Sequence, residues 1–219
     1  MVITSDNTAT DAMLGRTPGV DELNSWFHDA GFASLRMHTT VSAYFARVVR
    51  LVVPTARDVS EKELNDALLA NRAGELSPSG KSIAERLADP QTFLQGCGPF
   101  EDPSNWLGSI TARDVGRLLE QIETGALASK AHSAEMMDML KNQQLGARRI
   151  PLYLDTRHDI GHTTGDAPPC TANDVGVVYL KSGPTVMVFL SNQIRGNYGE
   201  AEVRIGEIAR QVAEYFDGP

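Results

Sequence analysis

Two β-branched runs near the C-terminal end constrain the fold of this chain most. They extend from Asp174 to Lys181 and from Thr185 to Asn192, and Ser182-Gly183-Pro184 joins them. Short runs rich in Val, Tyr and Phe, separated by turn residues, are typical of a β-hairpin. A third candidate strand precedes them and ends at residues 162–165, HTTG. The sequence therefore predicts a small antiparallel sheet of three strands.

The chain closes with an amphipathic segment from Gly199 to Phe216. Apolar residues recur there at the spacing of one helix face, which predicts a C-terminal helix lying on the sheet. The predicted apolar stripe consists of Ile205, Ile208, Ala209, Val212, Tyr215 and Phe216.

Residues 1–149 are predicted to be mostly helical, because apolar residues recur there with helical spacing between capping residues. An insertion is expected at about 40–105, and its part between Gly74 and Pro103 is expected to be irregular apart from one short helix, SIAERLA. Helices followed by a hairpin sheet and a covering helix indicate an α+β fold, which we expect to form one domain over residues 1–219. The expected helices span 18–31, 44–52, a segment starting at Ser60, 111–125 and a segment starting at Ser133.

Composition excludes several classes of protein. With 219 residues, 42% of them apolar, the chain can bury a core. A net charge of −8 argues against a nucleic-acid partner, which basic surfaces bind. No apolar run approaches the ~20 residues of a membrane span, and the first residues lack the pattern of a signal peptide. Cys97 and Cys170 allow one disulfide but do not identify a compartment.

Four stretches occur in an order that is informative as a set. They are SDNTATDAML at 5–14, SNWLGSITARDVGRLLEQIETGALAS at 104–129, LKNQQLGARRIP at 140–151 and HTTGDAPPCTANDVGVVYL at 162–180. Together they resemble the class A β-lactamase and penicillin-recognising serine hydrolase family. The resemblance covers the family's C-terminal part, from the S-D-N loop onward, and omits roughly residues 40–100 of this chain. It implies a β-lactamase/transpeptidase-like fold and a β-lactam or acyl-peptide ligand, with no cofactor or metal.

The family's nucleophile motif, S-x-x-K, does not occur in these residues. None of the five lysines has a serine three positions before it. Because the motif's lysine helps to deprotonate the serine, we expect the chain alone to be inactive. We interpret it as the C-terminal two-thirds of such a hydrolase, with Met1 at a position internal in relatives. Family members are exported, but this chain shows no signal peptide, so its localisation stays open. The alternative is a non-catalytic β-lactam- or peptidoglycan-binding pseudoenzyme, or an interaction protein.

The resemblance assigns roles to two groups of residues. In the S-D-N triplet, Ser5 would relay a proton to the leaving nitrogen, Asn7 would bind the acyl side chain and Asp6 would brace the loop. Asp6 is equally explained as a helix cap, and Ser-Asp-Asn is also a common turn sequence.

On the strand, Thr164 corresponds to the hydroxyl that binds the substrate carboxylate. Gly165 would allow close approach, and the N–H of Asp166 would donate to the oxyanion. Thr163 occupies the position of the family's K-T-G lysine. Because threonine carries no charge, attraction for a carboxylate should be weaker here.

A deacylating carboxylate is a further expected site residue. Glu61 and Asn65 match the E-x-x-x-N pattern in which a carboxylate activates water. Ser60 and Glu63 form a helix-capping pattern in the same stretch, which explains the acidic residues equally well.

Two other chemistries are weakly indicated. His158 and His162 are four residues apart, which on a strand is about 13 Å, too far for one metal ion. A Ser-His-Asp triad that uses Ser5 with His132 or His162 has no sequence support.

The resemblance also predicts a partner. Family sheets have two further strands beside the one predicted at 185–192, so in this chain that strand would form an open apolar edge. Open edges promote strand pairing, which predicts self-association through residues 185–192 or dependence on a partner fragment.

Overall fold

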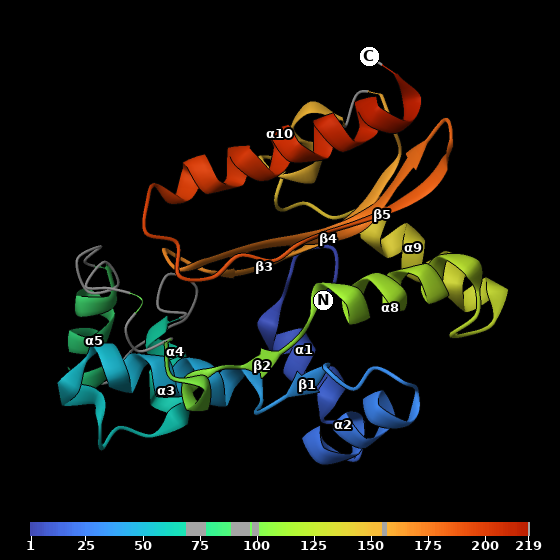
Figure 1. The fold of residues 1–219 in the computed structure, drawn as a ribbon. Coiled ribbons are helices and arrows are strands. Elements are labelled where there is room, and N and C mark those ends of the chain that lie inside the picture. Colours follow the sequence, from blue (N-terminus) through green and yellow to red (C-terminus); the bar gives the residue numbers. More distant parts are fainter. Residues whose placement is uncertain (69–77, 89–96, 98–100, 155–156, 219) are drawn as a thin grey trace. The chain divides into compact units, whose positions relative to one another are not determined.

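A computed structural model describes residues 1–68, 78–88, 97, 101–154 and 157–218 (Figure 1). The chain divides into two compact units. The larger unit comprises Met1–Asp6, Trp26–Arg36 and Ile110–Pro219, and the smaller unit comprises Asn7–Ser25 and Met37–Ser109. The expectation of one domain over 1–219 remains a prediction.

The larger unit is built on an antiparallel sheet of three strands in the order β3-β4-β5. The strands are β3 (Ile160–Ala167), β4 (Thr171–Leu180) and β5 (Gly183–Phe189). Thr164 pairs with Asp174 across β3 and β4, and Val178 pairs with Thr185 across β4 and β5. The predicted sheet and α+β class are confirmed, although β5 ends at Phe189 rather than Asn192.

Helix α10 (Tyr198–Asp217) covers one face of this sheet (Figure 1). Asn197 begins it as a side-chain cap, accepting a hydrogen bond from Glu200 N. The helix packs with the 3-10 helix η3 (Ile150–Tyr153) on the sheet. The buried cluster on this face consists of Ile150, Leu154, Val178, Leu180, Met187, Ile205, Ala209 and Ala213.

The predicted apolar stripe of this helix is only partly right. Ile205 and Ala209 are buried, but Ile208, Tyr215 and Phe216 are 40%, 83% and 53% exposed. The buried residues Ile205, Ala209 and Ala213 recur every four positions, so the contact face is narrower than the sequence pattern suggested.

Helices α8 (Ala112–Thr124) and α9 (Lys130–Lys141) lie on the opposite face (Figure 1). Thr111 caps the start of α8, and Gly125 ends it with a positive φ of 72°. Helix α9 begins earlier than predicted, with Ser129 as its cap, and Ser133 is buried within it. The cluster on this face consists of Phe32, Leu35, Val115, Leu119, Met137, Leu140 and Val177.

The smaller unit is helical. Its elements are α1 (Asn7–Leu14), α3 (Val41–Val52), η1 (Pro54–Ala56), α4 (Glu61–Leu68), α5 (Pro78–Ala88) and η2 (Pro103–Asn105). Asp11 ties α1 to α3 by accepting hydrogen bonds from Val41 N and Ser42 N, both at 2.8 Å. Its core consists of Ala46, Val49, Val53, Ala56, Leu64, Ala67 and Ile83. Helix α5 begins four residues before the predicted SIAERLA segment.

Helix α2 (Val20–Asp29) and strand β1 (Arg36–Met37) each continue from one unit into the other along the sequence. Strand β1 pairs with β2 (Gly108–Ser109), a pairing that the sequence did not indicate. Among the described residues, the helices are all too short or too polar to span a bilayer. Neither Cys97 nor Cys170 is a free thiol.

Candidate active-site strand and its charged support

Strand β3 carries the four residues that the sequence analysis assigned to ligand binding. It is an outer strand of the sheet, so one row of its backbone N–H and C=O groups faces away from β4. Thr163 and Thr164 are half-buried, whereas Gly165 and Asp166 are exposed. Gly165 and Asp166 are therefore the accessible part of this outer strand.

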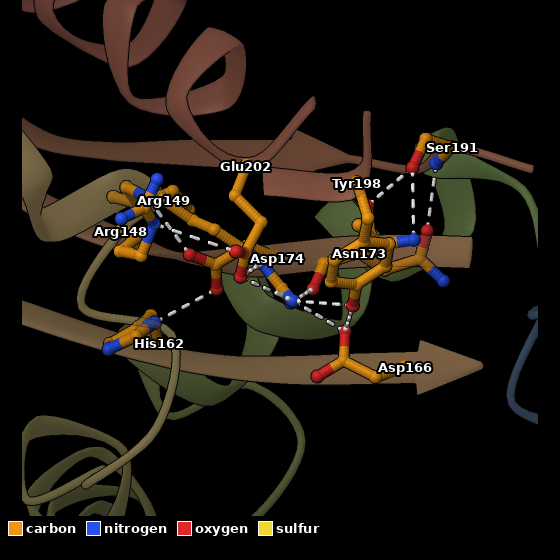
Figure 2. A network of polar contacts seen from close by, with 11 residues as sticks. Arg148, Arg149, His162, Asp166, Asn173, Asp174, Ser191, Tyr198 and Glu202 are labelled. Atoms are coloured by element: carbon orange, nitrogen blue, oxygen red, sulfur yellow. Dashed lines mark hydrogen bonds and ion pairs between the residues drawn. The ribbon is translucent and has the colours of Figure 1, made fainter. Parts of the chain in front are cut away.

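Asp166 is held by two side chains from outside its strand. Its Oδ1 lies 2.7 Å from Arg149 Nη2 and accepts a hydrogen bond from Tyr198 Oη at 3.0 Å. Figure 2 shows these contacts joining β3 to the start of α10. Burial and the nearby Asp166 carboxylate raise the pKa of Tyr198 to about 12, so its phenol keeps the proton that it donates.

Arg149 is the centre of this network. Its side chain is only 2% exposed. Nη1 donates to Asn173 O at 2.6 Å, and Nε and Nη2 contact Glu202 Oε1 at 3.2 and 3.1 Å. Burial alone would lower the pKa of Arg149, but the hydrogen bond and charge of Asp166 outweigh burial and raise it. The guanidinium therefore remains charged and ties β3, β4 and α10 together.

A second buried pair holds the middle of β3. His162 Nδ1 lies 2.9 Å from Asp174 Oδ1, and Asp174 Oδ2 accepts a hydrogen bond from Ile150 N at 3.0 Å. Asp174 is fully buried and His162 is 5% exposed. Burial raises the pKa of Asp174, while the hydrogen bond from His162 opposes this shift. The pair fixes the position of His162, the residue before Thr163 (Figure 2).

Gln143 links the N-terminal segment to the same strand. Its Nε2 donates to Val2 O at 3.0 Å and to Thr163 Oγ1 at 3.3 Å. The next residue, Gln144, donates its N–H to Ile3 O at 2.9 Å. Thr163, which stands where relatives are expected to have a lysine, is thus bonded to a neutral amide.

Ser5 follows this anchored segment in an unusual backbone conformation. Its φ is +51°, a left-handed value that residues other than glycine rarely adopt. Ser5 N donates to Val2 O at 3.4 Å and Asp6 N donates to Met1 O at 3.0 Å, which closes a tight turn just before α1. A turn is one of the two explanations that the sequence left open for S-D-N.

Asn7 and Glu61 belong to the smaller unit. Asn7 is the first residue of α1, and Glu61 is the exposed first residue of α4. Ser60 Oγ accepts a hydrogen bond from Glu63 N at 3.3 Å, as a helix cap does. Asn65 Nδ2 donates to Ser42 O at 3.5 Å. The water-activating role of Glu61 remains a prediction, and its place in the first turn of α4, where a carboxylate stabilises the helix N-terminus, is a sufficient structural explanation.

The structure identifies four residues that the sequence analysis did not assign: Arg149, Asp174, Tyr198 and Glu202. Arg149 lay within the quoted RRIP stretch, but nothing in the letters distinguished this buried arginine from the exposed Arg148 beside it. The others lie far apart in sequence. His158 precedes β3 rather than lying on it, and within the described ranges no group of three or more His, Cys, Asp or Glu residues could hold a metal ion.

The solved structures most similar to this fold include three β-lactamases. A β-lactamase from Chitinophaga pinensis DSM 2588 matches with a TM-score of 0.65 at 19% identity, covering 98% of this chain and 62% of that one. A class A β-lactamase from Bacteroides cellulosilyticus DSM 14838 matches with a TM-score of 0.65 at 15% identity, covering 100% and 61%. The W229D mutant of a class A β-lactamase of the last common ancestor of Gram-negative bacteria matches with a TM-score of 0.63 at 20% identity, covering 98% and 61%.

These structural matches show the fold, and the chain spans about three fifths of the length of the proteins that it matches. The sequence itself matches the model of the "Beta-lactamase enzyme family" over residues 1–216. Because this match covers nearly the whole chain, the protein belongs to the β-lactamase enzyme family.

Proposed function

We propose that this chain provides the ligand-binding strand of a β-lactamase-like serine hydrolase and binds β-lactams or related acyl-amides along β3. The observation that carries the proposal is the end of β3 at residues 163–166, where Gly165 and Asp166 are exposed and the buried side chains of Arg149 and Asp174 contact Asp166 and His162. Thr164, Gly165 and the N–H of Asp166 are the proposed ligand contacts. Ser5 and Asn7 are proposed as further contacts, and Glu61 as the residue that would activate water in a complete hydrolase of this family.

We further propose that these 219 residues bind such ligands without hydrolysing them. They contain no S-x-x-K motif, so the resemblance provides no activated hydroxyl. The competing proposal is that another serine acts as nucleophile. Nitrocefin hydrolysis, with mass spectrometry of the protein, separates the two. We expect no colour change and no acyl adduct, and either signal would overturn the inactive assignment.

Binding can be measured separately from turnover by titrating benzylpenicillin into the chain in a calorimeter. Replacing Thr164 by Ala should weaken binding several-fold, because it removes the hydroxyl proposed to contact the ligand carboxylate. Thr163→Lys should strengthen it, because a charge is introduced where the family motif has one. Thr185→Ala on β5 is the matched control and should leave the affinity unchanged. Absence of binding by benzylpenicillin and by other β-lactams, including ones without a carboxylate, would contradict the proposal.

We also propose that the chain self-associates through β5. This strand is the other outer strand of the sheet and includes the apolar residues Val186, Met187 and Val188. A second copy could extend the sheet by pairing with its open edge. Sedimentation velocity should detect concentration-dependent dimers, and Thr185→Lys should reduce them because charged residues disfavour edge pairing. A chain that stays monomeric at high concentration would count against this proposal.

A further inference from the structure

Asp166 places a carboxylate at the end of the strand that we propose as the ligand-binding edge. Only one of its two oxygens is engaged. Oδ1 contacts Arg149 and Tyr198, whereas no hydrogen bond or ion pair in the described part of the chain involves Oδ2. The side chain is 33% exposed, so a ligand along β3 can reach this acceptor.

The carboxylate is fixed before any ligand arrives. Arg149 is buried and contacts four groups, so it anchors Oδ1 rigidly. These are the carboxylates of Asp166 and Glu202, the carbonyl of Asn173 and the hydroxyl of Tyr198. Tyr198 adds a second bond to Oδ1 from α10. Figure 2 shows Asp166 directed towards these two residues. A hydrogen-bonding group whose rotamer is already fixed loses little entropy on binding, which favours selectivity.

The charges around this end of β3 disfavour a ligand carboxylate. Two guanidinium groups, Arg148 and Arg149, lie among three carboxylates, those of Asp166, Asp174 and Glu202. Arg149 is shielded from solvent, and the exposed Arg148 is directed at Glu202, 3.6 Å away.

The opposite end of β3 has its own cation, but that cation is already engaged. Lys141 Nζ lies 4.0 Å from the centre of the Tyr179 ring and 3.4 Å from Asp159 Oδ2. Thr163, in the place of the family's lysine, supplies no charge.

We infer that Asp166 determines ligand specificity, with Oδ2 accepting a hydrogen bond from an N–H or ammonium group of the ligand. The strand then selects acyl-amides that carry a neutral or cationic substituent over those that carry a carboxylate. This inference rests on the proposed function, because it requires the ligand to lie along β3. Tyr198 is a positioning residue, since it acts by orienting Asp166.

Three ligands with one acyl-amide core test the inference. They are benzylpenicillin, its methyl ester and its 2-aminoethyl amide, which carry a negative, zero and positive charge at the same position. Calorimetric titration into the 219-residue chain should give the tightest binding for the amine and the weakest for the carboxylate. We expect about a five- to tenfold difference in Kd between these two, decreasing as salt is added.

Three variants test whether Asp166 causes this preference for the amine. Asp166→Asn should reduce the difference between the amine and the carboxylate to less than about twofold while the ester still binds. Tyr198→Phe should reduce it partly. Glu120→Gln removes one exposed carboxylate from α8, in the same unit, and should leave the preference unchanged. Thermal unfolding of each variant verifies that the fold is intact.

The outcomes separate the inference from the proposed function. If none of the three ligands binds the unmodified chain, the proposed function fails. If all three bind equally, or if Asp166→Asn keeps the full preference for the amine, ligand binding stands and the role of Asp166 is refuted. An equal loss for all three ligands in Tyr198→Phe would mean that Tyr198 is only structural.

Discussion

The two outer strands of the sheet, β3 and β5, have the same secondary structure but are supported in different ways. Strand β3 is held by polar contacts: Arg149 binds Asp166 at its exposed end, and Asp174 binds His162 in its middle. Strand β5 is held by apolar contacts, with Met187 buried beneath α10 and Val186 and Val188 packed beside α8.

This difference indicates what each edge is suited for. Directional hydrogen bonds fix side-chain and backbone positions closely, as a ligand-binding strand requires. Apolar packing stabilises a strand but imposes little direction, and it leaves the backbone edge to pair with another strand. Four variants test the contrast.

The largest effect is expected from Arg149→Ala. Removing this guanidinium takes a hydrogen bond from the carbonyl of Asn173, removes the ion pair with Asp166 and leaves Glu202 only its longer contact with Arg148. Breaking a buried ion pair in this way should lower the free energy of unfolding by about 3–5 kcal/mol. Urea denaturation measures this loss.

Arg148→Ala is the control: that side chain is 61% exposed, and its loss should change stability by less than about 0.5 kcal/mol. Similar effects of both would show that the buried network is not the main support of β3.

A smaller loss is expected from Gly206→Ala on the α10 side. A Cβ there would lie 2.8 Å from Arg149 O and 2.8 Å from Leu152 Cβ, so α10 and the segment that contains Arg149 and Leu152 must move apart. Overpacking of this kind should lower the free energy of unfolding by about 1–3 kcal/mol, despite the better helix propensity of alanine. Unchanged stability in urea denaturation would mean that α10 can shift freely over η3.

Gly116→Ala on the β5 side should change the free energy of unfolding in the opposite direction. A Cβ at this position of α8 would lie 3.7 Å from Val188 Cγ2, an ordinary contact distance. The substitution should therefore raise the free energy of unfolding by about 0.5–1 kcal/mol, because alanine favours the helix and restricts the unfolded chain. The same denaturation experiment measures it, and a destabilised variant would show that α8 and β5 have no room for the added methyl group.

The smallest effect concerns Asp114, which anchors α8 at its N-terminal end. Its Oδ2 accepts a hydrogen bond from Ser34 N at 2.9 Å, and this bond lowers the pKa of Asp114. A lowered folded pKa means that the stabilisation is present above the unfolded pKa of 3.8 and is lost as pH falls through the folded value. The difference in stability between the unmodified chain and Asp114→Asn should thus be constant near neutral pH and shrink below about pH 4. A difference that grows in acid would contradict the assignment.

Asp114 and Asp174 illustrate why the candidate site could be predicted only in part. Both accept a hydrogen bond from a backbone N–H distant in sequence, yet burial raises the pKa of Asp174 while that of Asp114 is lowered. The HTTG stretch predicted a strand that ends at residues 162–165, and the strand is present because β-strand patterns are local, although β3 continues to Ala167. It could not identify the partners of Asp166, since Arg149 and Tyr198 lie 17 and 32 residues away.

Local patterns in the chain were enough to predict the α+β class, the three-stranded sheet, the C-terminal helix and most helix positions, because periodicity and capping act within a few residues. Three features could be seen only in the folded protein: which side chains of α10 are buried, which of two adjacent arginines is the centre of the network, and which oxygen of Asp166 stays available. Those outcomes depend on contacts between segments far apart in the chain, and hydrogen bonds and charges change in strength with the burial that only folding creates.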